Sequence, residues 1–356
     1  MAEIVKFILG RAGSGKSKKI NEIILNEINS ENEKLMVIVP EQFSFEKEKS
    51  MLEYLGNNKF SNVKVMSFSR LCDFIPSVVN IPAVKPSSDT AQILMISEAI
   101  ENIKSDLKMY AKGSADMKVA ELILKTIKEF KSNKIDIETL QKIQDLCSKD
   151  ILKQKIKEMI AIYDAYRNLC KSGEGDSADS LSALEDIIRS SDFFEGYTVF
   201  FDGFSNFTAQ QFSLIEEIML QAKEIYMAFC VDEKEGLTSE YSLFFPSLKT
   251  ISNIKKIASK NFISAEEKII LNESVKFENS ELKTLEENIF RPVKKACEKA
   301  PENIFLYNAL DLSDECEQVA KTVKKLVMQG KCRYKDIVIL TRDMQAYESV
   351  IKSSLR

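Results

Sequence analysis

Residues 7–20 read "FILGRAGSGKSKKI", a glycine-rich stretch that indicates the class of fold. Gly10, Gly15, Lys16 and Ser17 complete the pattern G-x-x-x-x-G-K-[ST]. In such a loop the glycines let the backbone aim its N–H groups at phosphate oxygens, the lysine reaches the β and γ phosphates, and the hydroxyl binds Mg²⁺. We therefore predict a site for ATP with Mg²⁺ on eight loop residues: Gly10, Arg11, Ala12, Gly13, Ser14, Gly15, Lys16 and Ser17.

The residues on both sides of the loop support this interpretation. The upstream run "EIVKFIL" is typical of a buried strand, and the isoleucines of residues 20–28 recur at helical spacing. A strand, a glycine loop and a helix are what a phosphate site requires, because the helix N-terminus adds its dipole to the anion site. The alternative is a glycine-rich turn that binds nothing.

The rest of the chain predicts an α/β protein with a doubly wound parallel sheet. Residues 86–190 contain only helical periodicity, so we expect an all-helical insertion there. Strand-like runs return at residue 197, and a new strand–helix–strand–helix unit begins near residue 303. Before the insertion the strand-like runs are "KLMVIVP" and "NVKVMSFSRL", after it "YTVFFDGF", "EIYMAFCVD" and "KIIL", and in the last unit "NIFLYNA" and "DIVILTRD".

Composition excludes several kinds of chemistry. The chain has no histidine, so Ser-His-Asp and Cys-His catalysis and histidine-bound metals are excluded. Its seven cysteines form no C-x-x-C pair, and no apolar run reaches about 18 residues. With the first strand so close to Met1, we expect no signal peptide, no membrane association and a cytoplasmic location. The net charge of −4 neither supports nor forbids a nucleic-acid partner.

A second stretch, "VFFDGFSNFTAQQ", bears on hydrolysis. In a P-loop ATPase a second strand ends in an aspartate that helps to hold Mg²⁺, and a neighbouring glutamate orients the attacking water. Asp202 directly follows the apolar residues Val199, Phe200 and Phe201 and is the expected second Mg²⁺ residue beside Ser17, although a turn or cap role is the alternative. Gly203 stands where the glutamate should be, so we identify no catalytic residue and expect weak ATP hydrolysis or none.

These stretches resemble the Rep- and UvrD-like helicases. "DGFSNFTAQQ" is similar to their D-E-x-Q-D-x-x-x-x-Q motif, with Asp202 and Gln211 matching and Gly203 and Ser205 departing from it. The resemblance implies RecA-like domains and adds Gln211 and Arg342, the latter in "DIVILTRD", to the nucleotide site. "SFSRLC" resembles the DNA-contacting motif T-F-H-x-L-C, which implies four candidates for contact with single-stranded DNA: Ser67, Phe68, Ser69 and Arg70.

In order along the chain, "GRAGSGKS", "VIVPEQFSFEKE", "FDGFSNFTAQQ" and "RYKDIVILTRD" resemble the AddB subunits of bacterial AddAB helicase–nucleases. That resemblance implies an N-terminal fragment, an AddA-like partner subunit in a heterodimer, and action on single- and double-stranded DNA ends in break repair by recombination. Nuclease residues and an iron–sulfur cluster are expected only beyond this chain. The implied domains are a first RecA-like domain (1–85 and 191–300), a helical insertion (86–190) and the truncated start of a second RecA-like domain (301–356).

Two other functions stay open at this point. One is an active ATP-dependent helicase motor in which another residue replaces the missing glutamate. Glu216 and Glu217 follow Gln211, but they lie about two helical turns away. The other is a P-loop regulator with no role on DNA.

Overall fold

The structure is a computed structural model that describes residues 4–32, 34–84, 87–111, 116–170, 177–232, 242–277, 279–290 and 300–355. The chain divides into two compact units, Met1–Phe277 and Glu278–Arg356. The first unit contains the predicted phosphate loop, and each unit is described by itself.

A parallel six-stranded sheet forms the centre of the first unit, in the order β3-β2-β4-β5-β1-β6. The predicted α/β fold with a RecA-like parallel sheet is therefore confirmed. β5 pairs with both β1 and β4, so one strand separates the strand before the phosphate loop from the strand that ends at Asp202. The strands are β1 (Ile4–Gly10), β2 (Leu35–Ile38), β3 (Val63–Met66), β4 (Thr198–Phe201), β5 (Glu224–Cys230) and β6 (Lys268–Leu271).

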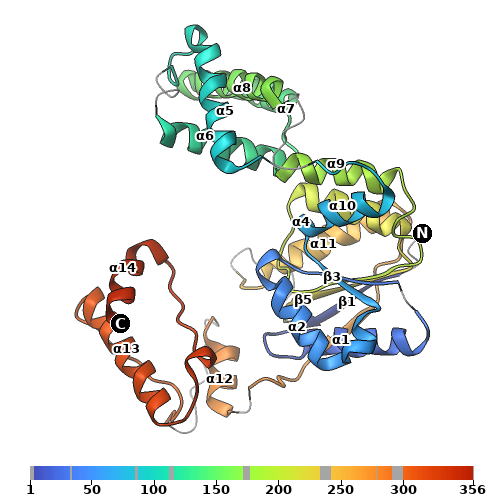
Figure 1. The fold of residues 1–356 in the computed structure, drawn as a ribbon, viewed down its shortest axis with the longest axis vertical. Helices are drawn as coiled ribbons and strands as arrows, with labels where there is room; N and C mark the ends of the chain where they lie inside the picture. Colours follow the sequence, from blue (N-terminus) through green and yellow to red (C-terminus); the bar gives the residue numbers. More distant parts are fainter. Residues whose placement is uncertain are drawn as a thin grey trace. The chain divides into compact units, whose positions relative to one another are not determined.

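Helices cover both faces of this sheet (Figure 1). On one face Ile20 and Ile24 of α1 (Lys16–Asn29) and Met51 of α2 (Ser44–Leu55) share a buried cluster with Phe200. The short helices η1 (Glu41–Phe43) and α3 (Asn57–Phe60) flank α2. The other face carries α4 (Phe68–Val79), α9 (Ser177–Arg189), α10 (Ala209–Gln221) and α11 (Phe245–Lys260).

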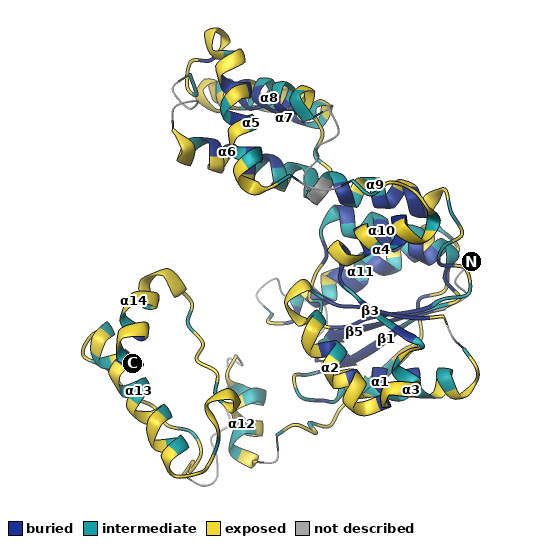
Figure 2. Ribbon diagram, in the orientation of Figure 1, coloured by how far each residue is buried: buried dark blue, intermediate teal, exposed yellow. Residues whose placement is uncertain are grey.

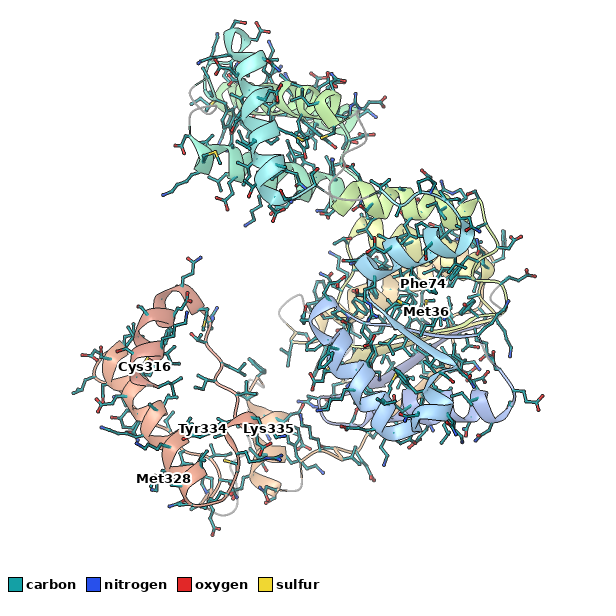
Figure 3. The ribbon with its side chains drawn as sticks, in the orientation of Figure 1. Met36, Phe74, Cys316, Met328, Tyr334 and Lys335 are labelled. Carbon is teal, nitrogen blue, oxygen red and sulfur yellow. The ribbon has the colours of Figure 1, made fainter. Side chains whose placement is uncertain are left out.

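The central strands β2 and β4 are buried along their whole length because helices cover both faces of the sheet, whose interior is dark blue in Figure 2. Successive side chains of a strand point to opposite faces, so Val199 and Phe201 join the cluster under α4 and α10 whereas Phe200 joins the cluster with α1. In the first of these clusters Met36 lies within the sheet and Phe74 packs from α4 (Figure 3).

The helical segment after α4 has a core of its own. Buried residues of α5, α6 and α8, including Ile100, Ile127 and Tyr166, form one apolar cluster. Leu184 and Ile188 of α9 belong instead to the sheet core, although α9 lies inside the predicted range 86–190. The exact domain limits stay a prediction. The elements of the segment are α5 (Asp89–Asn102), η2 (Lys104–Asp106), α6 (Met117–Ser132), α7 (Ile137–Leu146) and α8 (Asp150–Cys170).

The second unit is helical where strands were also expected. It contains α12 (Ser280–Asn288), α13 (Leu312–Met328), η4 (Tyr334–Asp336) and α14 (Met344–Ser354), with Cys316 buried on α13 (Figure 3). The expected strands at 303–309 and 336–343 form no β-ladder in the described part of this unit. Leu306 and Leu340 are 100% and 90% exposed there, and a strand without a paired neighbour has no ladder bonds to stabilise it.

Of the helices that the structure describes, none has the length and apolar character needed to cross a membrane.

Candidate nucleotide-binding site

The eight predicted loop residues lie between the end of β1 and the first turn of α1. Gly13 and Gly15 have φ angles of +74° and +88°, which only glycine adopts readily. At Gly10 a Cβ atom would lie 2.7 Å from the carbonyl oxygen of Leu271. The loop therefore has the tight backbone path that its sequence predicts.

Lys16 lies folded over this loop. Its Nζ atom donates hydrogen bonds of 2.8 Å to the carbonyl oxygens of Gly10 and Arg11. The ammonium group is thus held at the centre of the loop, while Ser17, in the first turn of α1, is exposed. A lysine in this place puts a positive charge where a bound phosphate would need one.

Two further segments brace the loop. Arg11 donates a hydrogen bond of 2.9 Å to Asp232, which follows β5, and lies 5.2 Å from the ring of Phe244. The carbonyl oxygen of Gly13 accepts hydrogen bonds from the backbone nitrogens of Val275 and Lys276, at 2.9 and 3.1 Å. The segment after β6 therefore fixes the conformation of the loop.

Asp202, the expected Mg²⁺ residue, is paired with a lysine. Its Oδ2 atom lies 2.9 Å from Nζ of Lys47 on α2, and the side chains are 9% and 8% exposed. Lys47 also donates to Oδ1 of Asn21 on α1, at 3.2 Å. Oδ2 of Asp202 thus already accepts a hydrogen bond from a buried ammonium, which would compete with Mg²⁺ for this oxygen. The expected Mg²⁺ role of Asp202 stays a prediction. Among the described residues, no group of three acidic, histidine or cysteine side chains is arranged to hold a metal.

Gly203 directly follows this aspartate and has a φ of +84°. A Cβ atom there would have room, because its nearest neighbour would be Cδ of Pro40 at 3.4 Å. The backbone angle, rather than crowding, therefore favours glycine at this position.

Gln211 has a structural task in this structure. It forms a capping box with Thr208 at the start of α10. Its side-chain Oε1 accepts a hydrogen bond from the backbone nitrogen of Thr208 at 3.0 Å, and its backbone nitrogen donates one to the Thr208 hydroxyl at 3.3 Å. Glu216 accepts hydrogen bonds from Lys260 and Asn261, and Glu217 accepts one from Arg189. These ion pairs supply no replacement for the glutamate missing at Gly203.

The four candidates for DNA contact differ in their surroundings. Ser67 is fully buried and caps α4, accepting from the Arg70 nitrogen at 3.3 Å. Phe68 is 5% exposed and packs edge-on against Phe204, so its ring occupies a core position rather than a stacking surface. Ser69 and Arg70 are exposed, and both contact acidic side chains.

Glu41 is the acidic partner of Ser69, whose backbone nitrogen and hydroxyl both donate to it. Burial alone would raise the pKa of Glu41, but the hydrogen bonds from Ser69 and Ser67 and the charge of Arg70 outweigh it and lower this pKa. Glu41 is therefore a stable anion beside the first turn of α4.

Arg342 belongs to the second unit and is exposed. Its predicted contact with the nucleotide stays a prediction.

Lys47 and Asn21 were not among the predicted site residues. A signal for Lys47 existed, because it shares one face of α2 with the buried Met51 and Leu55, at spacings of four and eight residues. A lysine on a core-facing stripe needs a partner of opposite charge. Which partner it has could not be read from the sequence, because Lys47 and Asp202 are separated by 155 positions.

The parallel sheet with β5 between β1 and β4, the glycine loop at the end of β1, and Asp202 at the end of β4 define a P-loop domain of the RecA-like type, here with a helical insertion. More specifically, the family described as ADDB, N-terminal, matches residues 7–286, and the chain belongs to this family.

Relatives in three bacteria are named as subunits of an ATP-dependent helicase/deoxyribonuclease. The protein of Clostridium novyi is 32% identical over 352 residues, which is 98% of this chain and 31% of that protein. Those of a Thermoanaerobacter species and of Clostridium acetobutylicum are 31% and 30% identical, each over 98% of this chain and over 31% and 30% of their own lengths. The chain thus spans about a third of the curated relatives that it matches.

Proposed function

We propose that this chain is the nucleotide-binding, DNA-contacting N-terminal part of a helicase–nuclease subunit that processes DNA double-strand breaks. The name of the relatives, which describes one subunit of a combined helicase and deoxyribonuclease, supports the class of complex. It also supports a partner subunit and a DNA substrate. We propose that the partner is of the AddA type and that the substrate is single- and double-stranded DNA ends. The nuclease, and any iron–sulfur cluster, would lie outside this chain.

The nucleotide site is proposed on one observation above the others, the geometry of residues 10–17 with Lys16 at its centre. The hydroxyl of Ser14 adds support. It is buried and, among the residues that the structure describes, has no hydrogen-bond partner. A phosphate oxygen held in the loop would supply one.

We expect this site to hold ATP but to hydrolyse it weakly or not at all. Gly203 has no side chain to orient water, the described acidic residues of α10 are engaged in ion pairs, and Asp202 is paired with Lys47. Removal of general-base assistance of this kind costs about 10²–10⁴ in rate. A bound nucleotide would then act as a structural ligand rather than as a source of work.

Contact with single-stranded DNA is proposed at Ser69 and Arg70 alone of the four candidates, because these two are exposed. Two assays on the whole chain test this function. Equilibrium binding to a labelled single strand should be measurable and should weaken with salt, whereas a strand-displacement assay with ATP should show no unwinding. ATP-driven unwinding would establish the motor, and no strand binding at low salt would favour the regulator.

A further inference from the structure

The ion pair of Lys47 and Asp202 joins three parts of the nucleotide-binding domain. Lys47 comes from the buried face of α2, Asp202 from the end of β4, and Asn21, the second partner of the ammonium, from the helix that follows the phosphate loop. All three residues are at most 9% exposed. Lys47 therefore lies in the interior beside the position that the sequence predicts for a metal.

A carboxylate in this interior needs a positive charge close to it. In a P-loop ATPase the bound magnesium ion supplies that charge at the end of the second strand. Here the ammonium group of Lys47 lies 2.9 Å from Oδ2 of Asp202 and donates a hydrogen bond to it. The charge that the site requires is thus part of the polypeptide.

A magnesium ion at Asp202 would compete with this lysine. Mg²⁺ demands near-octahedral oxygen ligation at about 2.0–2.1 Å and keeps several of its waters. Its arrival would place two like charges together inside the domain, and Lys47 would have to leave a pocket in which Asn21 also holds it. Both effects oppose binding of the ion at Asp202.

We propose that Lys47 substitutes for the divalent metal at Asp202, so that this site binds nucleoside triphosphate without Mg²⁺. This inference rests on the proposed nucleotide binding by residues 10–17. It assigns Lys47 a positioning role: the ammonium holds Asp202 in place and neutralises it, and Lys16 remains the cation that meets the phosphates.

The test is a titration of fluorescent ATP into the whole chain, once in excess MgCl₂ and once in excess EDTA. Three proteins are compared: the unsubstituted chain, Lys47→Met, and the control Lys49→Met, which removes an exposed lysine from the same helix. We expect the unsubstituted chain and Lys49→Met to bind with affinities that differ by less than about threefold between the two buffers. Lys47→Met leaves Asp202 without its cation, so it should bind at least about tenfold more tightly in MgCl₂ than in EDTA.

A fourth protein serves as a control for misfolding of Lys47→Met, in which the buried carboxylate of Asp202 has no partner. The double substitution Lys47→Met with Asp202→Asn removes both charges at once, and its binding should again be insensitive to the metal. For the unsubstituted chain, affinity at least about tenfold weaker in EDTA would overturn the inference whatever the variants do. Metal-insensitive binding by a folded Lys47→Met would also overturn it. Absence of ATP binding in both buffers would instead refute the proposed nucleotide site, and the inference with it.

Discussion

Arg70, in the first turn of α4, forms an ion pair with Glu48 on α2. Both side chains are substantially exposed, at 46% and 32%, and exposed pairs of this kind contribute little to stability. Arg70 can therefore exchange its carboxylate partner for a DNA phosphate. We predict that Arg70→Ala weakens binding of single-stranded DNA about equally for all sequences and makes the salt dependence shallower by about one unit at most. Fluorescence anisotropy over a series of salt concentrations measures both, with Arg167→Ala as the exposed control on α8; unchanged affinity at low salt would remove Arg70 from the interface.

Glu48 should act in the opposite direction. Glu48→Gln removes the negative charge that neutralises Arg70 and would repel a phosphate, so we expect single-strand binding to become tighter by about two- to fivefold at low salt. The same anisotropy titration checks this result. Weaker binding by Glu48→Gln would show that the pair serves to orient Arg70 rather than to mask it.

The buried pair of Lys47 and Asp202 predicts an effect on folding stability. Lys47→Met should lower the free energy of unfolding by about 3–5 kcal/mol, because it leaves Asp202 as an uncompensated buried charge. Urea unfolding followed by circular dichroism at pH 7 measures this, with Lys49→Met as the control. Addition of Asp202→Asn should recover much of the loss, and a double variant as unstable as Lys47→Met would contradict this explanation.

Gly203→Glu is expected to restore little hydrolysis. The φ of +84° makes any side chain strained there, at a cost of roughly 1–2 kcal/mol, and Asp202 is still paired with Lys47. We predict that phosphate release rises by less than about tenfold, below the 10²-fold or more of an effective general base. Gly203→Ala carries the same backbone strain without the carboxylate and is the matched control. A rise of about 10²-fold in Gly203→Glu alone would show that the missing glutamate is the only deficiency.

Glu158 anchors the turn before α6 and predicts a dependence of stability on pH. It is 2% exposed and accepts hydrogen bonds from the backbone nitrogens of Lys108 and Tyr110, both at 3.0 Å, from that of Met109 at 2.9 Å, and from Gln154 at 2.7 Å. Burial would raise the pKa of Glu158, but these hydrogen bonds outweigh it and lower the pKa below its usual 4.5. The stabilisation is therefore complete above about pH 4.5 and is lost as the pH falls through the folded-state pKa.

Glu158→Gln should accordingly lower the free energy of unfolding at pH 7 by about 1–3 kcal/mol and should differ less from the unsubstituted chain near pH 3. Urea unfolding at the two pH values checks this, with the exposed Glu121→Gln of α6 as the control. A difference that stays constant or grows on acidification would mean that the charge of Glu158 does not provide the stabilisation.

Much of the fold was predictable because its signals are local. The strands of a sheet buried on both faces read as continuous apolar runs, such as "TVFF" of β4 and "LMVI" of β2, and the glycines at positions 10 and 15 mark the phosphate loop. The expected strands of the second unit also read as apolar runs, but a ladder depends on a neighbour that the run itself does not specify.

The candidate site was predictable in position but less so in contacts. A motif placed Asp202 and Gln211 correctly at the end of β4 and the start of α10. In the structure, however, the Gln211 side chain accepts a hydrogen bond from Thr208, and the carboxylate of Asp202 forms an ion pair with Lys47. Thr208 contacts Gln211 through the capping box of α10, and Lys47 contacts Asp202 from α2. Both contacts depend on the three-dimensional arrangement, which the motif does not specify. Phe68 likewise occupies a position of the DNA-contacting motif, but its ring packs in the core.

Residues 10–17 are proposed to hold ATP without turning it over. The most direct measurement pairs an equilibrium titration of fluorescent ATP with steady-state phosphate release, with and without single-stranded DNA, for the unsubstituted chain and Lys16→Ala. We predict that the chain binds ATP, that Lys16→Ala loses most of that affinity while remaining folded, and that phosphate release stays below roughly 1 s⁻¹, the low end of ordinary enzyme turnover. Turnover of tens per second, on the order of an active enzyme, that Lys16→Ala abolishes would contradict this proposal and establish a working motor.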